Sequence, residues 1–295
     1  MVKLLGPNEI RSLAARLDLA PTKKLGQNFV IDPNTGRRIV AAADVVAGER
    51  VVEIGPGLGS LTLGLIEAGA SVTAVEIDRR LAALLPETAS TMGAPDGTLE
   101  VVSADALEVT ELPGDPVALV ANLPYNVSVP VLLHFLETFP GIQRGLVMVQ
   151  AEVGERLAAG PGSRTYGIPS VKAAWYADVR LAGRIGRHVF WPAPNVDSIL
   201  VRLDRHEQPG TEAERLVVWK LVDAAFGQRR KMLRQSLSGV LGSDASAIIE
   251  AAGVDPTARG ERLTVADFLA IARTVTGLDG AGLDGAEIPS TPALP

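Results

Sequence analysis

The sequence contains no cysteine, only three histidines and no long apolar run. The absence of cysteine excludes disulfides, a thiolate nucleophile and a cysteine-based metal site. His134, His188 and His206 share no motif, so we expect structural roles for them and no metal ion. No apolar run approaches the roughly 18 residues of a membrane span, and charges interrupt the apolar N-terminus, which argues against a secretory signal. We therefore expect a cytoplasmic protein with no membrane partner.

Acidic residues outnumber basic residues by only a few. The formal net charge is −6, from 34 acidic and 28 basic residues, which alone argues mildly against a nucleic-acid partner. Residues 276–295 contribute −3 of this charge, because they hold three acids and no Lys or Arg. Basic residues cluster elsewhere, at Lys23, Lys24, Arg229, Arg230, Lys231 and Arg234. Net charge therefore leaves the class of partner open.

Short β-branched runs alternate with helical patterns from residue 50 onward, at intervals of roughly 20–30 residues. The expected strands are 50–55, 71–78, 99–105, 117–123 and 145–150, with 198–203 as a candidate for a later strand. This alternation predicts βαβ units. We therefore expect an α/β fold with a mostly parallel sheet and helices on both of its faces.

The pattern changes after residue 205. Residues 206–275 are helical in pattern with no strand between the helices, which predicts a small all-α C-terminal domain. Residues 276–295 are rich in Gly, Pro and Ala and acidic, and we expect this tail to be disordered. The α/β domain would then span 1–205, and its first 32 residues would hold a helix over 7–19 and a loop over 21–32.

The residues that end the predicted strands are the candidates for chemistry, because ligands of open α/β sheets bind beyond the carboxyl ends of the strands. The first strand ends in "EIGPGLGS", with glycines at 55, 57 and 59. Glycine lets the backbone approach a ligand closely. The spacing G-x-G-x-G, preceded by Glu53, favours a nucleoside without phosphate, whereas a pyrophosphate favours G-x-G-x-x-G. Taken alone, this loop could equally be a structural turn.

Acids end the next two predicted strands. Glu76 lies 21 residues beyond Gly55, the interval at which such folds place a carboxylate on ribose hydroxyls. A carboxylate only accepts hydrogen bonds, and a vicinal diol offers two donors. Asp105 could accept a hydrogen bond from an adenine amino group. Glu76 alone could instead be a solvent-facing acid at a helix start, but acids in register at successive strand ends favour a bound adenosyl moiety.

The run "VANLPYNVS" (120–128) ends the strand that we expect at the centre of the sheet. The side-chain oxygen of Asn122 and the carbonyl of Leu123 or Pro124 can accept both N–H bonds of an exocyclic aromatic amine, and Tyr125 offers a ring for the base to stack on. Holding both hydrogens out of the ring plane favours a pyramidal nitrogen whose lone pair points at a methyl donor. Positioning and electrostatics would then carry the catalysis, with no activated Ser, Cys or His nucleophile. The alternative is a strand end that simply turns at Asn and Pro.

A second aromatic precedes a proline-stiffened loop in "HVFWPAPNVDS" (188–198). Phe190 could cover the other face of the base. Stacking is worth roughly 1–3 kcal/mol per base, so two faces could offset an extrusion cost of a few kcal/mol. The alternative for Phe190 and Trp191 is ordinary packing, and we favour a ligand contact for Phe190 more than for Trp191.

Seven motifs occur in one order, namely "KKLGQNFV", "EIGPGLGSLT", "VEID", "SADAL", "NLPYNVS", "VFWPAPNVDS" and "FGQRRKMLR". Over about residues 20–235 this order resembles the small-subunit ribosomal RNA adenine dimethyltransferases, the KsgA-like family. The resemblance implies a Rossmann-like class I methyltransferase with a seven-stranded sheet that uses S-adenosylmethionine. It also implies dimethylation of the exocyclic amino groups of two adjacent adenosines in the 3′-terminal hairpin of small-subunit (16S) rRNA during ribosome biogenesis.

The resemblance assigns site residues position by position. It implies cofactor contacts at Asn28, Val30, Gly55, Gly57, Glu76, Asp105 and Asn122. It implies that the target adenine is held by Asn122, Leu123, Pro124, Tyr125 and Phe190. Val30 departs from the leucine that is usual in the family, which should matter little if its contact is made through the backbone. The "QNFV" loop could fold over the bound cofactor and exclude water.

RNA contacts are expected at the two basic clusters. Lys23 and Lys24 adjoin the "QNFV" loop, and the cluster Arg229, Arg230, Lys231 and Arg234 lies in a stretch with no acid from 224 to 243. These residues would contact phosphates, which position RNA without selecting its sequence; the alternative is a solvated helix face. The expected partner is small-subunit rRNA within an assembling 30S particle, bound by a monomer and recognised mainly by shape.

Three rival functions remain at this point. One is an rRNA adenine methyltransferase of the erythromycin-resistance type, which modifies the large subunit; "LGQNFV" and "FGQRRKMLR" favour the small-subunit type. Another is a non-catalytic ribosome assembly or transcription factor that keeps this fold and only binds RNA, against which the intact "NLPY" argues. The last is a nicotinamide oxidoreductase, which the glycine spacing and the lack of a hydride-chemistry Tyr/Lys or His pairing disfavour.

Overall fold

The structure is a computed structural model of the chain, and it describes residues 2–19 and 28–278. These residues form two compact units, which are described separately. The first unit holds the residues up to 159 together with 172–207, and the second holds 160–171 together with the residues after 207. Lys23 and Lys24 lie outside the described residues, as do residues 279–295 of the predicted acidic tail. The first three residues of that predicted tail, 276–278, instead belong to the last helix, α12 (Val265–Leu278).

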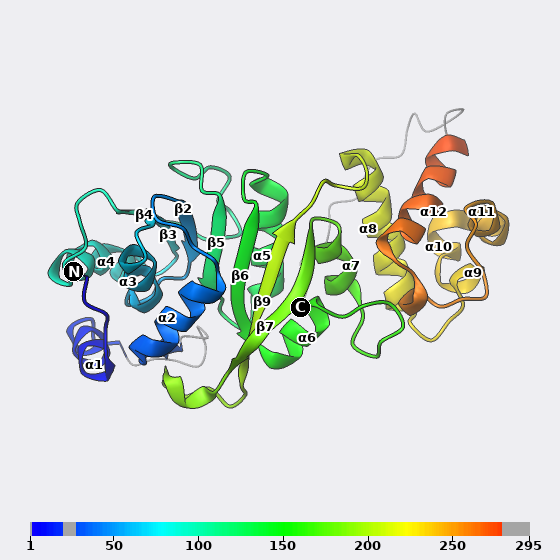
Figure 1. The fold of residues 1–295 in the computed structure, drawn as a ribbon. Helices are drawn as coiled ribbons and strands as arrows, with labels where there is room; N and C mark the ends of the chain where they lie inside the picture. Colours follow the sequence, from blue (N-terminus) through cyan, green and yellow to red (C-terminus); the bar gives the residue numbers. More distant parts are fainter. Residues whose placement is uncertain (1, 20–27, 279–295) are drawn as a thin grey trace. The chain divides into compact units, whose positions relative to one another are not determined.

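A seven-stranded sheet forms the centre of the first unit (Figure 1). In spatial order its strands are β4 (Leu99–Ser103), β3 (Ser71–Glu76), β2 (Arg50–Ile54), β5 (Ala118–Asn122), β6 (Arg144–Gln150), β9 (Ser198–Arg205) and β7 (Ala177–Ile185). The first five pair in parallel, and β9 is antiparallel to both of its neighbours. The predicted mostly parallel sheet is confirmed, and the strand that ends at Asn122 lies in its middle.

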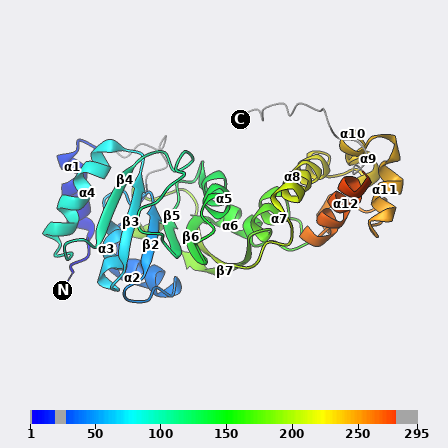
Figure 2. The ribbon, with the colours of Figure 1, turned by 90° about the horizontal axis from the view of Figure 1, so that it is seen from above.

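Helices cover both faces of this sheet, which is why its inner strands are apolar on both sides. Helices α2 (Pro33–Ala42) and α3 (Ser60–Glu67) lie on one face, and α5 (Ser128–Thr138) lies on the other, as Figures 1 and 2 both show. On the first face Ile39 and Leu65 from the helices pack in one buried cluster with Val51, Val120 and Leu146 from the strands. This burial fixes the sheet and therefore the positions of the strand ends.

The N-terminal part of the unit differs in detail from the sequence prediction. Helix α2 begins directly after the predicted loop over 21–32, because Asp32 caps it by accepting hydrogen bonds from the N–H groups of Asn34 (3.3 Å) and Thr35 (3.0 Å). It ends at residue 42, just before Asp44 takes a left-handed conformation with φ of 52°. The remaining helices of the first unit are α1 (Pro7–Arg16), α4 (Arg79–Thr91) and α6 (Ala151–Leu157), together with part of α7 (Ile168–Ala174).

Two sheet elements were not predicted. The edge strand β7 alternates poorly, since Arg180, Leu181, Gly183 and Arg184 are exposed and a bulge interrupts its pairing between Leu181 and Gly183. A separate two-stranded sheet pairs β1 (Phe29–Val30) antiparallel with β8 (Phe190–Trp191). This second pairing brings residues 29 and 30 against residues 190 and 191, which precede the predicted proline-rich loop.

The second unit is helical and has its own core. Its helices are α8 (Glu212–Gly227), α9 (Leu233–Ser236), α10 (Ser238–Leu241), α11 (Ala245–Ala251) and α12 (Val265–Leu278). A capping box between Thr211 and Glu214 begins α8. Residues 160–171, which the sequence placed in the first domain, join this unit: the Tyr166 hydroxyl donates to the Leu263 carbonyl at 2.7 Å, and the Gly162 N–H donates to the Glu261 carbonyl at 2.7 Å.

The packing of α6 on β9 gives a test of the fold. A Cβ added at Gly154 in α6 would overlap Cγ2 of Ile199 and lie 3.0 Å from Cγ2 of Val201, both in the core. We expect Gly154→Ala to lower the free energy of unfolding by about 1–3 kcal/mol through overpacking. Gly239→Ala is the matched control, because nothing lies within 4 Å of a Cβ there. Urea denaturation checks both variants, and equal midpoints would contradict this packing.

Candidate functional site

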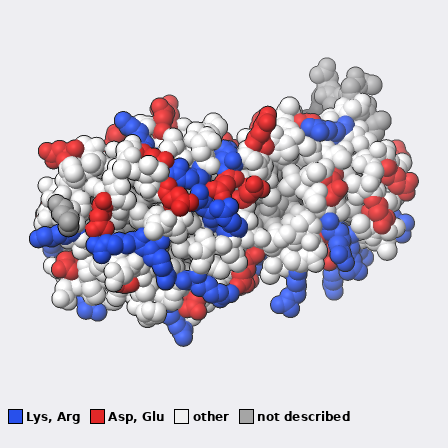
Figure 3. All heavy atoms as spheres, in the orientation of Figure 1, with Lys and Arg blue, Asp and Glu red and all other residues white. Residues whose placement is uncertain are grey.

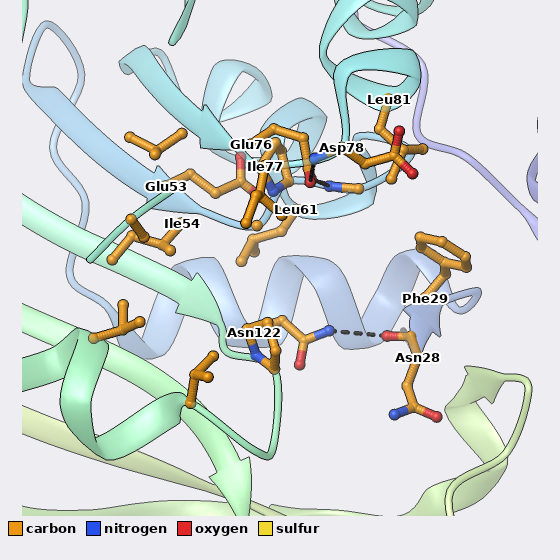
Figure 4. Close-up of a pocket in the computed structure, with 18 of the residues that line it drawn as sticks. Asn28, Phe29, Glu53, Ile54, Leu61, Glu76, Ile77, Asp78, Leu81 and Asn122 are labelled. Carbon is orange, nitrogen blue, oxygen red and sulfur yellow. Dashed lines mark hydrogen bonds between the residues drawn. The ribbon is translucent and has the colours of Figure 1, made fainter. Parts of the chain in front are cut away.

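A cavity lies at the carboxyl ends of β2, β3 and β5, where the fold class predicts a ligand (Figure 4). Its lining comes from the glycine loop after β2, the end of β3, the residues after β4 and β5, and β1. All seven residues that were predicted to contact a cofactor line it: Asn28, Val30, Gly55, Gly57, Glu76, Asp105 and Asn122. The structure therefore brings together residues that are up to 94 positions apart in the sequence.

The glycine loop needs its glycines for backbone reasons that the structure makes explicit. Gly55 and Gly57 have φ of 67° and 57°, in the left-handed region that side chains disfavour. A Cβ at Gly57 would also lie 2.8 Å from the ring of Phe29 in β1. The loop can thus pass close to β1, and its Gly57 N–H donates to the Glu76 carboxylate at 3.0 Å.

Glu76 is held in a fixed orientation by two backbone donors. Its Oε2 accepts from Gly57, and its Oε1 accepts from the N–H of Asp78 at 2.9 Å. The side chain is 5% exposed, and this burial raises the pKa of Glu76. Each carboxylate oxygen has a second lone pair, so an oriented Glu76 can still accept hydrogen bonds from ligand hydroxyls.

Asp105 follows β4 and lines the same cavity. Its Oδ1 accepts the N–H of Leu107 at 2.9 Å, which fixes the carboxylate in a turn and leaves Oδ2 as its second acceptor. Ile77, between Glu76 and Asp78, is 64% exposed and lines the cavity with its apolar side chain. Ile77 was not among the predicted site residues, because the predicted strand over 71–78 included it, whereas β3 ends at Glu76.

Glu53 is a buried acid that the sequence analysis noted beside the glycine loop without assigning it a contact. It is 1% exposed, and its Oε2 accepts a hydrogen bond from the Thr62 hydroxyl at 2.6 Å. Burial raises the pKa of Glu53 to about 8, and repulsion from Glu76 adds to this effect. Two acids in one cavity with raised pKa values indicate a site that favours a positively charged ligand.

The amide of Asn122 is oriented by a tether to the N-terminal segment. Its Nδ2 donates to the carbonyl oxygen of Asn28 at 3.0 Å, so its Oδ1 points in the other direction (Figure 4). The Asn122 Nδ2 donor is therefore used within the protein, and the Oδ1 acceptor is left for a ligand. Val30 is held in the same segment, because its carbonyl accepts from the Ser60 hydroxyl at 2.7 Å.

Of the three residues after Asn122, the first is buried in the core and the other two are partly exposed. Leu123 is 1% exposed and its N–H donates to the Met148 carbonyl at 3.1 Å, so only its backbone carbonyl can serve a ligand. Pro124 lines the cavity, and its carbonyl accepts the Val127 N–H at 3.3 Å in a turn. Tyr125 is half-buried, and burial raises the pKa of its hydroxyl.

Phe190 is buried in the structure. It is 3% exposed, belongs to the same buried cluster as Val30 and Ile39, and is not among the residues that line the cavity. The reason is the β1–β8 pairing, which aligns Phe190 with Val30 and turns the ring into the core. Trp191 instead stacks on Phe29, with ring centroids 6.5 Å apart.

The guanidinium of Arg229 is used within the second unit. It pairs with Glu261 at 2.9 Å and donates to the carbonyls of Tyr166 (2.7 Å) and Arg164 (2.8 Å). It also lies 6.0 Å from the centroid of the Phe226 ring. These contacts bind segment 160–171 to α8, so Arg229 helps to hold the second unit together.

The rest of that cluster is exposed. Arg230, Lys231 and Arg234 are all exposed where the chain passes from α8 to α9. Figure 3 shows Lys and Arg side chains gathered at the edge of the second unit that Figure 1 assigns to this connection. Exposed cations on the connection and at the start of α9 can contact an extended anion such as an RNA backbone.

Two histidines have backbone partners: His134 Nε2 bonds to the Val109 carbonyl at 2.8 Å, and His206 Nδ1 bonds to the Glu207 carbonyl at 2.8 Å. Within residues 2–19 and 28–278, no group of three or more His, Asp or Glu side chains is arranged to hold a metal ion. In the same residues, no helix combines the length and the apolar character that crossing a membrane requires.

Glu53 predicts how stability depends on pH. Its pKa is raised from 4.5 to about 8 in the folded state, so the folded state binds its proton more tightly. Glu53 therefore contributes its full share to the free energy of unfolding below about pH 4.5. That contribution is lost as the pH rises from about 4.5 toward 8, with a slope of up to about 1.4 kcal/mol per pH unit.

We expect Glu53→Gln, which can keep the contact with Thr62, to flatten this loss between about pH 6 and pH 8. Urea unfolding of both proteins across that range checks the prediction. Part of the slope should remain, because burial raises the pKa of Glu76 as well. Parallel stability curves for the two proteins would contradict a protonated Glu53.

Comparisons with known proteins place the chain in a family. The family model described as ribosomal RNA adenine dimethylase matches residues 20–276. A relative from Leifsonia xyli, named ribosomal RNA small subunit methyltransferase A, is 64% identical and covers 92% of this chain and 98% of its own length. A relative of the same name from Streptomyces coelicolor is 62% identical and covers 91% of this chain and 96% of its own.

Solved structures show the same fold. The 23S rRNA methyltransferase ErmE is 28% identical, covers 84% of this chain and all of its own, and superposes with a TM-score of 0.63. A dimethyladenosine transferase from Plasmodium falciparum is 24% identical, covers 81% of this chain and 94% of its own, and has a TM-score of 0.69, a likeness of fold. With a family model matched over most of the chain and relatives above 60% identity, the chain belongs to the ribosomal RNA adenine dimethylase family.

Proposed function

We propose that this protein uses S-adenosylmethionine to dimethylate N6 of two adjacent adenosines in the 3′-terminal hairpin of small-subunit rRNA, acting as a monomer on an assembling 30S particle. Membership of the family and the names of the 64% and 62% identical relatives support this function. The observation that carries the chemistry is the tethered Asn122, whose acceptor oxygen points away from Asn28.

The cavity fits S-adenosylmethionine by the chemistry of its lining. Glu76 offers oriented acceptors for the ribose hydroxyls, and Asp105 offers an acceptor for the adenine amino group. Ile77 offers an exposed apolar side chain for the adenine ring. Glu53 and Glu76 have raised pKa values in the cavity, and a bound cation would favour their charged forms. When bound, the cofactor supplies an electrophilic methyl carbon on a sulfonium.

The protein's contribution to transfer is the placement of the attacking nitrogen. An adenine amino group is a weak nucleophile because its lone pair is delocalised into the ring. Asn122 Oδ1 and the carbonyl of Leu123 or Pro124 accept its two hydrogens out of the ring plane, which favours a pyramidal nitrogen with an aimed lone pair. No base is required before attack, since the proton leaves once the nitrogen is positive.

Tyr125 provides the stacking surface for the target base in this proposal. Tyr125 lies three residues beyond the end of β5 and is half-buried, so part of its side chain is accessible to a base. Stacking on an aromatic side chain is worth roughly 1–3 kcal/mol per base. Phe190 is left out of the proposed base site, because its ring is buried in the core.

A large-subunit target is the second candidate, since ErmE aligns over its whole length. Two observations favour the small subunit. The relatives above 60% identity carry the small-subunit name, whereas ErmE is only 28% identical. A methylation assay on undermethylated small and large subunits separates the two targets.

Asn122→Ala is the direct test of the enzyme function. We expect it to lower methyl transfer to undermethylated small subunits by about a hundredfold or more, as for loss of a preorganised transition-state contact. Asn126→Ala is the matched control, an exposed asparagine four residues away. Incorporation of labelled methyl and mass analysis of the rRNA measure both variants. If the wild type binds RNA but transfers nothing, or if Asn122→Ala is fully active, the proposed function is wrong.

The exposed cations give a separate test of RNA contact. Replacing Arg230, Lys231 and Arg234 by Ala should weaken small-subunit binding and reduce its salt dependence by about one unit of slope per lost phosphate contact. Lys220→Ala, an exposed cation on α8, should change neither. Arg229→Ala should instead lower the thermal stability of the second unit. Binding at several salt concentrations checks these expectations, and an unchanged slope for the triple variant would contradict them.

A further inference from the structure

The ring of Tyr125 is anchored by its hydroxyl to a buried serine. Tyr125 Oη and Ser198 Oγ are 2.8 Å apart, and Ser198 is 0% exposed. Ser198 is the first residue of β9, and β6 lies between β9 and the β5 strand that leads to Tyr125. The hydrogen bond therefore joins the ends of two strands that are not paired with each other.

Ser198 is a rigid anchor because strands hold it on both sides. Its Cα pairs with Gln150 of β6 and with Ile185 of β7. The residue before it, Asp197, is also held, since its carbonyl accepts the Ala151 N–H at 3.0 Å. Tyr125, by contrast, lies in a turn beyond the last residue of β5. The serine is thus the fixed partner and the tyrosine ring is the group that becomes positioned.

The simplest explanation of this contact is that each hydroxyl group gives the other a hydrogen-bond partner away from water. The location argues for more, because the ring that the bond restrains is half-buried and adjoins Pro124, which lines the cavity. A half-buried ring has other rotamers available unless its far end is held. Burial and the nearby Asp197 carboxylate raise the pKa of Tyr125, so the phenol keeps its proton for this bond at neutral pH.

We propose that Ser198 is a positioning residue for methyl transfer: its hydroxyl holds the Tyr125 ring in the orientation in which the target adenine stacks on it. The inference rests on the proposed function, since it gives Ser198 a role through a stacked target base. Ser198 itself touches neither base nor cofactor in this account. The Ser198 hydroxyl affects the fraction of time in which the target base is held with its nitrogen aligned with the methyl donor. It does not affect the cavity that binds the cofactor.

Loss of this bond should lower the rate of transfer more than it weakens binding. Tyr125→Phe keeps the ring and its stacking area, and Ser198→Ala keeps the strand, but either change frees the ring to leave its orientation. We expect each to lower the single-turnover rate about tenfold, the range of one net hydrogen bond, with little change in KM. The affinity for S-adenosylhomocysteine should not change.

A double-mutant cycle separates this role from a structural one. Because both single variants remove the same bond, Ser198→Ala combined with Tyr125→Phe should be no slower than either alone. Ser198→Thr, which restores a hydroxyl, should recover much of the rate. Thr73→Val is the control, since it removes another buried strand hydroxyl, which donates to the Pro113 carbonyl at 3.1 Å, in the same unit; it should change stability without changing the rate.

A fluorescent reporter of stacking completes the test. With 2-aminopurine at the target position of a hairpin substrate, weaker quenching in Ser198→Ala and in Tyr125→Phe than in the wild type supports the proposal. Multiplicative rate losses in the double variant, or wild-type rates in both single variants, overturn it. If Ser198→Ala fails to fold, Tyr125→Phe still decides, because it removes the bond from the half-exposed side. A fully active Tyr125→Ala would instead show that the stacking role in the proposed function is wrong.

Discussion

The hydrogen bond from Asn122 Nδ2 to the Asn28 carbonyl is the interaction on which the site depends. It fixes which end of the amide faces a substrate, a choice that the side chain alone leaves open. The same bond ties the end of the central strand to the segment that forms β1, and β1 approaches the glycine loop at Gly57. The cofactor side and the base side of the cavity are therefore set by one short stretch of backbone.

The fold supports this interaction because the strand ends lie together at one edge of a rigid sheet. The residues of the site lower the free energy of unfolding in two ways. Glu53 and Glu76 are buried acids with raised pKa values, a charge arrangement that a cavity without a cationic ligand does not favour. Gly55 and Gly57 adopt backbone conformations that forgo side-chain packing. Such departures from the most stable choice are expected where a structure is shaped for a ligand.

Most of the sheet and the cofactor side of the cavity could be predicted from the sequence. The periodicity of apolar residues and the polar residues that end each strand can both be seen within short stretches of sequence. The edge strand β7 could not, since its exposed arginines and its bulge hide the alternation. Phe190 and Arg229 were predicted to contact the target base and RNA phosphates. The sequence did not indicate that Phe190 is buried beside β1, or that Arg229 has four partners in the second unit. The Asn122 tether and the Ser198 contact join residues 94 and 73 positions apart, and no local pattern records them.

The most direct measurement is a crystal structure of the protein with S-adenosylhomocysteine and an adenosine-containing hairpin. The account predicts that Asn122 Nδ2 still donates to Asn28, that Asn122 Oδ1 lies within hydrogen-bond distance of the adenine N6, and that N6 faces the sulfur of the cofactor product. A flipped amide, or a target base held away from the end of β5, would contradict it.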